Sequence, residues 1–210
     1  MAALDPGEVE LFRFADQLPE ALWNDLEARD PMEAAASCDA FLEDGRFRLT
    51  FFSRDYVIDP KERSITEALR PEHKCSYQTG LVLVTALAKA QNAPQSGEMI
   101  TPGELPGGRM FFNGPHELPT APILKRFGDD PEGLIAASQT MGARQIDESA
   151  DVALFIPGLP RVPMWLLFWQ GDDEFEARVV MGIDSRAHLH LALDVVWAMC
   201  NVLTGRLVTA

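Results

Sequence analysis

The feature that most constrains the fold of this chain is an unbroken run of six apolar residues, Met164 to Trp169, which reads M-W-L-L-F-W. Successive side chains of a strand point to opposite faces, so this run is apolar on both faces. Such a strand lies inside a sheet that is covered on both sides. A second apolar run, Phe175 to Ile183, follows the acidic segment Asp172 to Glu174. The two runs predict an antiparallel hairpin with a central strand.

A second strand pattern, in which apolar and polar residues alternate, precedes this hairpin in the chain. Phe47, Leu49 and Phe51 are separated by arginine and threonine, and they follow Asp44-Gly45, a strong hairpin signal. Arg54-Asp55 then turns the chain into a further apolar segment. We expect a three-stranded antiparallel meander with one face toward solvent.

Apolar residues that recur every three or four positions predict helices in the rest of the chain. Residues 94–119 are the exception, because ten of these 26 residues are proline or glycine. Apolar residues within them predict a long loop with its own anchors, a kind of loop that often carries function. The expected helices span residues 6–29 with a break near Gln17, 32–37, 77–93, 119–127 and 131–141, and a last helix starts at Asp184-Ser185 and buries Leu189, Val196, Cys200, Leu203 and Leu207.

These patterns predict an α+β fold. It has one or more antiparallel sheets flanked by helices, a long Gly/Pro-rich loop in the middle and a C-terminal helix. A length of 210 residues is typical of one domain. We expect residues 1–210 to form a single α+β domain, with an N-terminal helical segment at 1–38 and the core at 39–210.

Charge and cysteine content exclude several functions. The net charge of −14 arises from 32 acidic and 18 basic residues, which disfavours nucleic acid and anionic membrane surfaces as partners. Three widely spaced cysteines, Cys38, Cys75 and Cys200, cannot supply the four thiolates of an all-cysteine iron–sulfur cluster. Neither a signal peptide nor a run of about 18 apolar residues is present, so we expect a cytoplasmic protein with reduced thiols.

Four motifs occur in an order that resembles one protein family. They are L-P-G-G at Leu105 to Gly108, I-P-G-L-P-R-V-P from Ile156, G-D-D-E-F from Gly171, and Ile183-Asp184 followed by a helix that contains Asp194. In this order they resemble the prokaryotic family catalogued as domain of unknown function 3786, over roughly residues 40 to 207. The resemblance implies an origin mainly among anaerobes and a neighbourhood of corrinoid and one-carbon proteins, and it implies no stated activity.

The chain departs from that family pattern at two places. The family pattern is G-D-E-E-F, then F-D, then an E-D pair in the final helix. Here Gly182-Ile183 lacks the aromatic residue before Asp184, and Leu193-Asp194 lacks the glutamate. An acid pair in the final helix is therefore not expected.

The long loop holds the preferred candidate for ligand binding. Paired glycines let a backbone approach a ligand closely and point N–H groups at an anion, and an arginine adds a charge-assisted bond. A purely structural turn is the alternative, since no phosphate-loop signature follows. The candidate loop residues are Gly107, Gly108, Arg109, Phe111, Phe112 and His116.

Two further groups of polar residues are candidates, each with a plain structural alternative. Asp172 and Glu174 offer oxygen ligands, or they are the solvated turn of a hairpin. His190 and Asp194, four residues apart, share a helix face for acid–base work, or they are a surface pair. The segment from His73 to Cys75 offers two soft ligands with no second pair elsewhere, which favours a loop without metal.

The sequence leaves three classes of function open. The leading expectation is a cytoplasmic accessory protein that binds a small molecule or cofactor, such as a corrinoid or another tetrapyrrole, or that assists a metalloenzyme partner. An enzyme that uses Asp172, Glu174, His190 and Asp194 is the second. A structural or interaction subunit, with homo-oligomers among its forms, is the third.

Overall fold

The computed structural model describes residues 12–210, and its first sheet is a meander of five strands rather than three. Each strand pairs with the next in antiparallel fashion, in the order β1-β2-β3-β4-β5. Phe47, Leu49 and Phe51 point into the core while their neighbours are exposed, which confirms the expected alternation. The strands are β1 Phe41–Glu43, β2 Arg46–Phe51, β3 Arg54–Asp59, β4 Ser64–Glu67 and β5 Arg70–Lys74.

The second sheet confirms the prediction drawn from the apolar run. Its order is β6-β10-β9-β8-β7, so β9 is the middle strand, and seven of its eight residues are buried. Because both of its faces are apolar, β9 is stable only where neighbours and packed layers cover it. The strands are β6 Met99–Ile100, β7 Arg144–Gln145, β8 Val152–Leu159, β9 Val162–Trp169 and β10 Arg178–Asp184.

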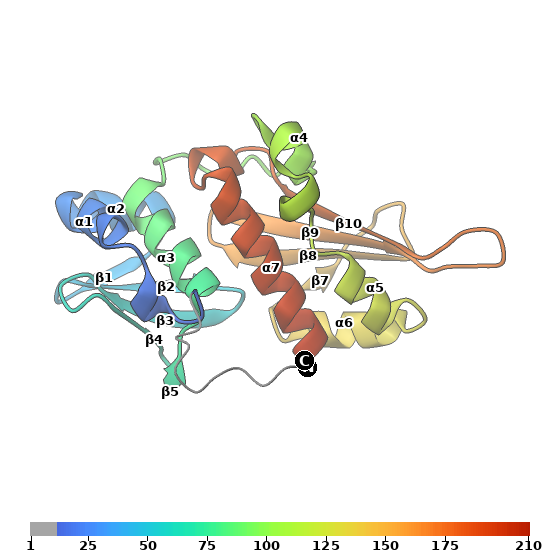
Figure 1. Cartoon of the computed structure of the whole chain (residues 1–210), viewed down its shortest axis with the longest axis horizontal. Coiled ribbons are helices and arrows are strands. Elements are labelled where there is room, and N and C mark those ends of the chain that lie inside the picture. Colours follow the sequence, from blue (N-terminus) through green and yellow to red (C-terminus); the bar gives the residue numbers. More distant parts are fainter. Residues whose placement is uncertain (1–11) are drawn as a thin grey trace.

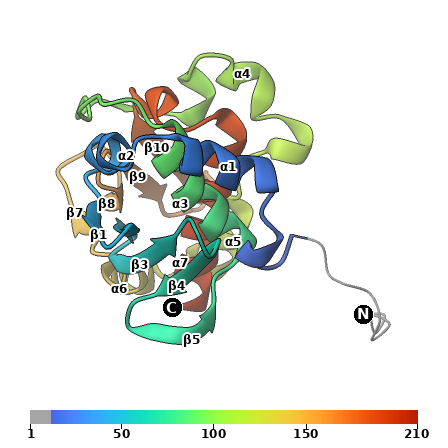
Figure 2. The ribbon, with the colours of Figure 1, turned by 90° about the vertical axis from the view of Figure 1, so that its left-hand side faces the viewer.

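Two long helices, α3 and α7, pack against each other between the sheets, as Figure 1 shows. Helices α1 and α2 pack on α3 over the first sheet, and the turned view in Figure 2 shows all three on one side of β3 and β4. Helices α5 and α6 pack on α7 beside the second sheet. The helices are α1 Glu20–Ala28, α2 Pro31–Cys38, α3 Tyr77–Lys89, α5 Ala121–Phe127, α6 Pro131–Gln139 and α7 Leu193–Thr209.

Helix α7 carries the apolar stripe that the sequence predicts except for Leu189, which lies before this helix in the short helix η4 (Ala187–Leu189) and is only half-buried. Val196, Cys200, Leu203 and Leu207 are all fully buried. Each large aliphatic side chain of this kind contributes about 1.5–3 kcal/mol on burial. This stripe fixes which face of α7 meets the rest of the protein, and so fixes the direction of the polar side chains beside it.

Backbone and side-chain bonds join the two sheets directly. The Phe52 amide at the β2–β3 turn donates to the Gly158 carbonyl at 2.9 Å. Arg161, in the β8–β9 turn, donates to both carboxylate oxygens of Asp39 and to the Ala36 carbonyl at the end of α2. The proline-rich stretch from Ile156 forms the β8–β9 hairpin, with a bulge between Ile156 and Leu159.

Several predicted boundaries are corrected by the structure. The last helix begins at Leu193 and not at Asp184-Ser185. The carboxylate of Asp184 accepts hydrogen bonds from the amides of Ser96 and Gly97 and does not cap a helix, and the short helix η4 (Ala187–Leu189) lies in between. Strand β10 begins at Arg178, so Phe175 belongs to the turn and is 70% exposed. Helix α3 ends at Lys89 and not at residue 93. The predicted helix over 6–29 becomes η1 (Ala15–Gln17) and α1, and its residues 6–11 lie outside the described part.

The Gly/Pro-rich stretch at 94–119 is mostly irregular, as predicted, but it contains short elements. These are β6, η2 (Pro102–Glu104), α4 (Gly108–Phe111) and η3 (Gly114–His116). Leu105 anchors the stretch in the core, whereas Met110 is 89% exposed and anchors nothing. In the part of the chain that the structure describes, no helix combines the length and the apolar character needed to cross a bilayer.

Candidate functional site

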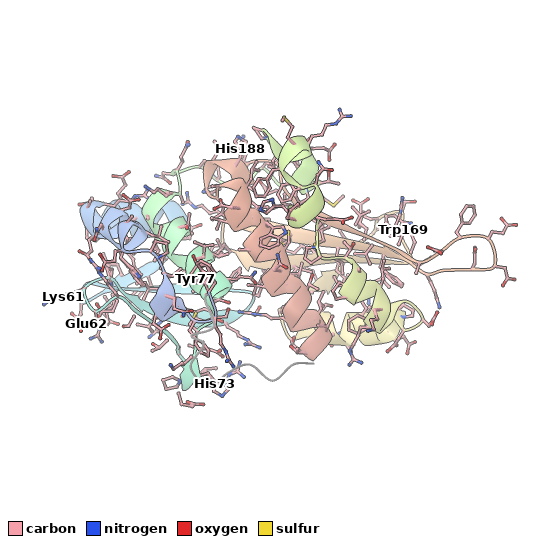
Figure 3. The ribbon with its side chains drawn as sticks, viewed as in Figure 1. Lys61, Glu62, His73, Tyr77, Trp169 and His188 are labelled. Atoms are coloured by element: carbon pink, nitrogen blue, oxygen red, sulfur yellow. The ribbon has the colours of Figure 1, made fainter. Side chains whose placement is uncertain are left out.

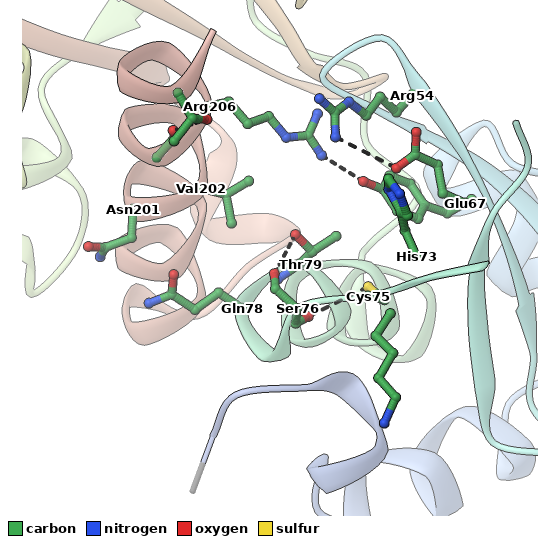
Figure 4. A pocket seen from close by; sticks show the side chains of 14 residues that line it. Arg54, Glu67, His73, Cys75, Ser76, Gln78, Thr79, Asn201, Val202 and Arg206 are labelled. Carbon is green, nitrogen blue, oxygen red and sulfur yellow. Dashed lines mark hydrogen bonds and ion pairs between the residues drawn. The ribbon is translucent and has the colours of Figure 1, made fainter. Parts of the chain in front are cut away.

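A cavity of about 360 Å³ lies where the first sheet meets the two long helices (Figure 4). Its walls come from β3, β4 and β5, from the first turn of α3 and from the last turns of α7. The volume falls at the lower end of the range of small-molecule sites, about 300–1,000 Å³. The lining residues are Arg54, Tyr56, Glu67, His73, Lys74, Cys75, Ser76, Gln78, Thr79, Asn201, Val202, Gly205, Arg206 and Thr209.

Arg206 crosses from α7 to the first sheet at this cavity. Its Nη1 donates to the carbonyl oxygens of Phe51 and Phe52, each at 3.1 Å, and its Nη2 donates to the Tyr56 hydroxyl at 2.7 Å. The guanidinium also lies 5.4 Å from the centroid of each phenylalanine ring. Burial lowers the pKa of this arginine from its ordinary value. Arginine nevertheless stays protonated in proteins, so a full positive charge is held here.

The turn that receives Arg206 has an unusual backbone. Phe52 and Ser53, between β2 and β3, have φ of 47° and 56°. Two residues with positive φ make the tight turn whose twist matches that of the flanking strands. A bulky residue such as phenylalanine pays roughly 1–2 kcal/mol for this conformation. Full burial of the Phe52 ring and the bonds from Arg206 offset that cost.

Glu67 is the one carboxylate in the cavity wall, and its charge is already neutralised. It lies 2.8 Å from the Arg70 guanidinium and 3.6 Å from that of Arg54. None of the ion pairs within residues 12–210 involves Arg206. The half-buried guanidinium of Arg206 therefore donates the hydrogen bonds described above to neutral acceptors.

The thiol of Cys75 and the hydroxyl of Tyr56 in the cavity wall carry no charge near pH 7. Burial raises the pKa of the Cys75 thiol to about 12, although Arg206 acts to lower it. Burial also raises the pKa of the Tyr56 hydroxyl. Ser76 begins α3, and its hydroxyl accepts from the Thr79 amide and donates to the Thr79 hydroxyl. Cys75 is therefore a protonated wall residue and not a nucleophile.

The candidate residues of the long loop lie elsewhere, against the start of α7. Gly107 has a φ of 79° and precedes α4, and a side-chain carbon on buried Gly108 would collide with the Pro102 carbonyl. His116 stacks on Phe111 at 4.4 Å and meets the edge of Trp197 of α7 at 5.5 Å. This part of the loop is a docking turn held by aromatic contacts. Arg109 is exposed, Phe112 is half-buried against the core, and none of the loop candidates lines the cavity.

The acidic segment is the tip of the projecting β9–β10 hairpin, which extends beyond Trp169 in Figure 3. One oxygen of Asp172 accepts from the backbone amides of Glu174 and Phe175, at 2.8 and 2.7 Å. These bonds lower the pKa of Asp172. Its carboxylate thus closes a local turn and, like that of Glu174, is exposed to solvent. The geometry agrees with the solvated turn.

His190 and Asp194 do not share a helix face, because α7 starts only at Leu193. His190 is 97% buried, and neither ring nitrogen has a hydrogen-bond partner in the structure. Asp194 is exposed on the first turn of α7. Figure 1 places the start of α7 far from the tip of the β9–β10 hairpin, so the carboxylate–histidine candidates occupy separate places.

His73 and Cys75 both line the cavity, at the end of β5 and not in a loop. Within residues 12–210, no group of three or more His, Cys, Asp or Glu side chains is arranged to hold a metal ion. The central residue of the site, Arg206, was not among the sequence candidates. A helical signal marks it, because Val202 and Leu203, four and three residues earlier, put Arg206 on the buried face of α7.

Comparison with known proteins identifies one family. A search of the curated proteins and a search of the solved structures each gave no match. The model of a family described as Domain of unknown function (DUF3786) matches residues 30–206, which hold all the cavity residues except Thr209. The order of the L-P-G-G, I-P-G-L-P and G-D-D-E-F motifs already indicated this relationship, and the chain belongs to the DUF3786 family.

Proposed function

We propose that this protein binds a small polar molecule in the cavity around Arg206 and serves as a cytoplasmic binding or accessory protein. The observation that carries the proposal is the convergence of polar side chains from three segments distant in sequence. Arg54 comes from β3, Gln78 from α3 and Asn201 from α7. Small-molecule sites combine such convergent polar groups with a concave wall.

The family resemblance implies a link to corrinoids or other tetrapyrroles, so a corrinoid and haem are included in the binding experiment described below. A tetrapyrrole is a broad and largely apolar plate, whereas this cavity is small and has charged walls. The geometry therefore favours a compact polar ligand. A role beside a metalloenzyme partner is compatible with either ligand.

Gly205 allows the cavity to be closed with a matched control. It lines the cavity, and a side-chain carbon added there meets no atom within 4 Å. Gly205→Trp narrows the cavity, while Gly205→Ala adds one methyl group. Both substitutions improve the helix propensity of α7.

The experiment measures thermal stabilisation by a panel of small polar metabolites, a corrinoid and haem. We expect polar compounds to raise the melting temperature of the wild type and of Gly205→Ala, and not that of Gly205→Trp. Equal stabilisation of all three proteins places binding outside the cavity and contradicts the proposal. If the corrinoid or haem stabilises the wild type and Gly205→Trp equally, the macrocycle binds outside the cavity. That result also contradicts the proposal.

A further inference from the structure

We infer that the ligand of the Arg206 cavity is an oxyanion, a small molecule that carries a carboxylate or phosphate group. This inference rests on the proposed binding function and names the chemical class of its ligand. It depends on three features of the cavity: the excess of positive charge in its wall, a guanidinium that has no ion-pair partner among residues 12–210, and the uncharged state of the Cys75 thiol.

The sign of charge in the cavity is opposite to that of the protein. The chain carries a net charge of −14. The cavity wall holds three permanent cations, Arg54, Lys74 and Arg206, against the single carboxylate of Glu67, and His73 lies beside them. A concave site lined by one sign of charge concentrates ligands of the opposite sign.

Two of these cations have weak competing partners. Lys74 lies 3.9 Å from Asp16, and both side chains are about two-thirds exposed. Arg54 lies 3.6 Å from Glu67, whose closer partner is Arg70 at 2.8 Å. The exposed Lys74–Asp16 pair is worth little, so Lys74 is free to turn toward a ligand. Arg54 can do the same because the largely buried Glu67 keeps its closer partner, Arg70.

Arg206 supplies the fixed part of the site. Its Nη atoms are engaged by Tyr56 and by two backbone carbonyls, while its Nε–H has no partner among residues 12–210. These bonds hold the guanidinium plane before a ligand arrives. A preorganised donor of this kind favours planar or tetrahedral oxyanions, to which guanidinium N–H groups make charge-assisted bonds.

Helix ends do not decide the sign of the site. Ser76, Gln78 and Thr79 bring the positive end of α3 to the cavity, whereas Gly205 and Thr209 bring the negative end of α7. Each end is equivalent to about half a unit charge, so the two roughly cancel. The full charges of the side chains therefore dominate, and the protonated Cys75 thiol subtracts nothing from them.

The test compares charged probes with neutral ones of the same shape. Acetate and its neutral analogue acetamide, together with inorganic phosphate, are titrated into ¹⁵N-labelled protein. The signals followed are the Arg206 Nε–H and the backbone amides of Ser76 and Thr79. We expect acetate and phosphate to shift these signals, acetamide to leave them unmoved, and the affinity to fall as ionic strength rises.

Variants assign the effect to the cavity. Arg54→Gln and Lys74→Gln remove partly exposed charges, and we expect each to weaken acetate and phosphate binding by about two- to fivefold. Lys61→Gln is the matched control, because it removes one charge from a turn that lies away from the cavity in Figure 3. Arg206→Lys keeps the charge but loses the planar donor, and we expect a larger loss than at either rim position.

The outcomes separate the two proposals. Acetamide that shifts the cavity signals as strongly as acetate overturns the oxyanion inference and leaves the binding function standing. An equal loss of affinity in Lys61→Gln and Lys74→Gln also overturns it, since net charge alone would then explain the effect. The binding function fails as well if no probe shifts the NMR signals of the cavity and Gly205→Trp binds every compound of the metabolite panel as the wild type does.

Discussion

At the scale of single residues, Arg206 joins the fold to the proposed chemistry. Its guanidinium satisfies two carbonyls of the strained β2–β3 turn and the Tyr56 hydroxyl. A buried charge without an ion-pair partner is costly, because its desolvation is only partly offset by neutral acceptors. An oxyanion in the cavity would offset more of that cost. Stability and ligand affinity are thus coupled through one side chain.

His190 yields a prediction about pH. Burial lowers the pKa of His190, and the positive charge of Arg161 and the nearby His188 lower it further. The carboxylates of Asp184 and Asp39 act in the opposite direction and raise it. The folded protein therefore binds fewer protons here than the unfolded chain. The stability that the uncharged His190 allows is fully present above the pKa of histidine in the unfolded chain, near 6.5. It is lost as pH falls from there toward the pKa of His190 in the folded protein. The contribution of this residue is at most about 1.4 kcal/mol per pH unit.

We expect His190→Leu to flatten this dependence. Urea denaturation at pH 8, 6.5 and 5 should show a smaller loss of unfolding free energy in the variant than in the wild type. The exposed His73, changed to Gln, serves as the control and should keep the wild-type slope. Identical slopes in the wild type and His190→Leu would show that the imidazole is paired in solution.

Two glycines give a prediction of opposite signs. A side chain at Gly205 meets open space within a regular helix, so Gly205→Ala should stabilise the protein by about 0.5–1 kcal/mol. A side chain at Gly108 meets the Pro102 carbonyl, so Gly108→Ala forces the backbone of α4 to move. We expect a loss of about 1–3 kcal/mol there. Chemical denaturation of both variants checks the pair, and a Gly108→Ala protein as stable as the wild type would contradict the tight docking of the loop.

At the scale of elements, Asp184 fastens the end of β10 to the beginning of the long loop. Its fully buried carboxylate accepts from the backbone amides of Ser96, Gly97 and Arg186 at 2.8–3.1 Å. Asp184→Ala leaves these amides without acceptors. We expect a loss of about 2–4 kcal/mol in the free energy of unfolding. Asp194→Ala removes an exposed acid from α7 and should change stability by less than about 0.5 kcal/mol.

Hydrogen exchange adds a local readout to this comparison. In Asp184→Ala, the amides of Ser96 and Gly97 should exchange much faster than in the wild type, while those in the middle of α7 keep their protection. Unchanged exchange at Ser96 and Gly97 would mean that the carboxylate does not hold the loop.

The elements were predictable where side-chain burial sets the pattern. The double-faced apolar run gave the middle position of β9, and the alternation from Phe47 to Phe51 gave the buried face of β2. Strands β4 and β5 were missed because they are short and mostly polar, with only Ile65 buried. The start of α7 was misplaced because Asp184 resembles a helix cap, and only the tertiary structure shows its carboxylate bound to a distant loop.

At the scale of the whole molecule, the cavity results from packing the first sheet against α3 and α7. Arg54 and Arg206 both line it although they are 152 positions apart in the sequence. Strand periodicity and helix caps are local signals, so they predicted β3, α3 and α7 as separate elements. They missed β4 and β5 and could not show that these walls meet. The loop was predicted to bind a ligand because it combines glycine, proline and aromatic residues. In the structure, the aromatic contacts of this loop instead dock it on α7.

Four of the exposed large apolar side chains among residues 12–210 lie on separate elements and form no common patch. Phe41, Leu69, Met110 and Phe175 lie on β1, the β4–β5 turn, α4 and the β9–β10 hairpin. These elements are spread over different sides of the molecule in Figure 1. Single exposed apolar residues are ordinary on protein surfaces, so the cavity remains the better-supported site.

The most direct test of an oxyanion site at Arg206 is a crystal of the protein soaked in selenate, with anomalous diffraction recorded at the selenium edge. Selenate has the tetrahedral shape and charge of an oxyanion ligand, and its position is measured independently of any activity. We predict an anomalous peak in the cavity, within hydrogen-bond distance of Arg206 and facing Arg54 or Ser76, that is absent from crystals of Gly205→Trp. Selenate bound only at other surfaces, with an empty cavity in the wild type, would contradict this account.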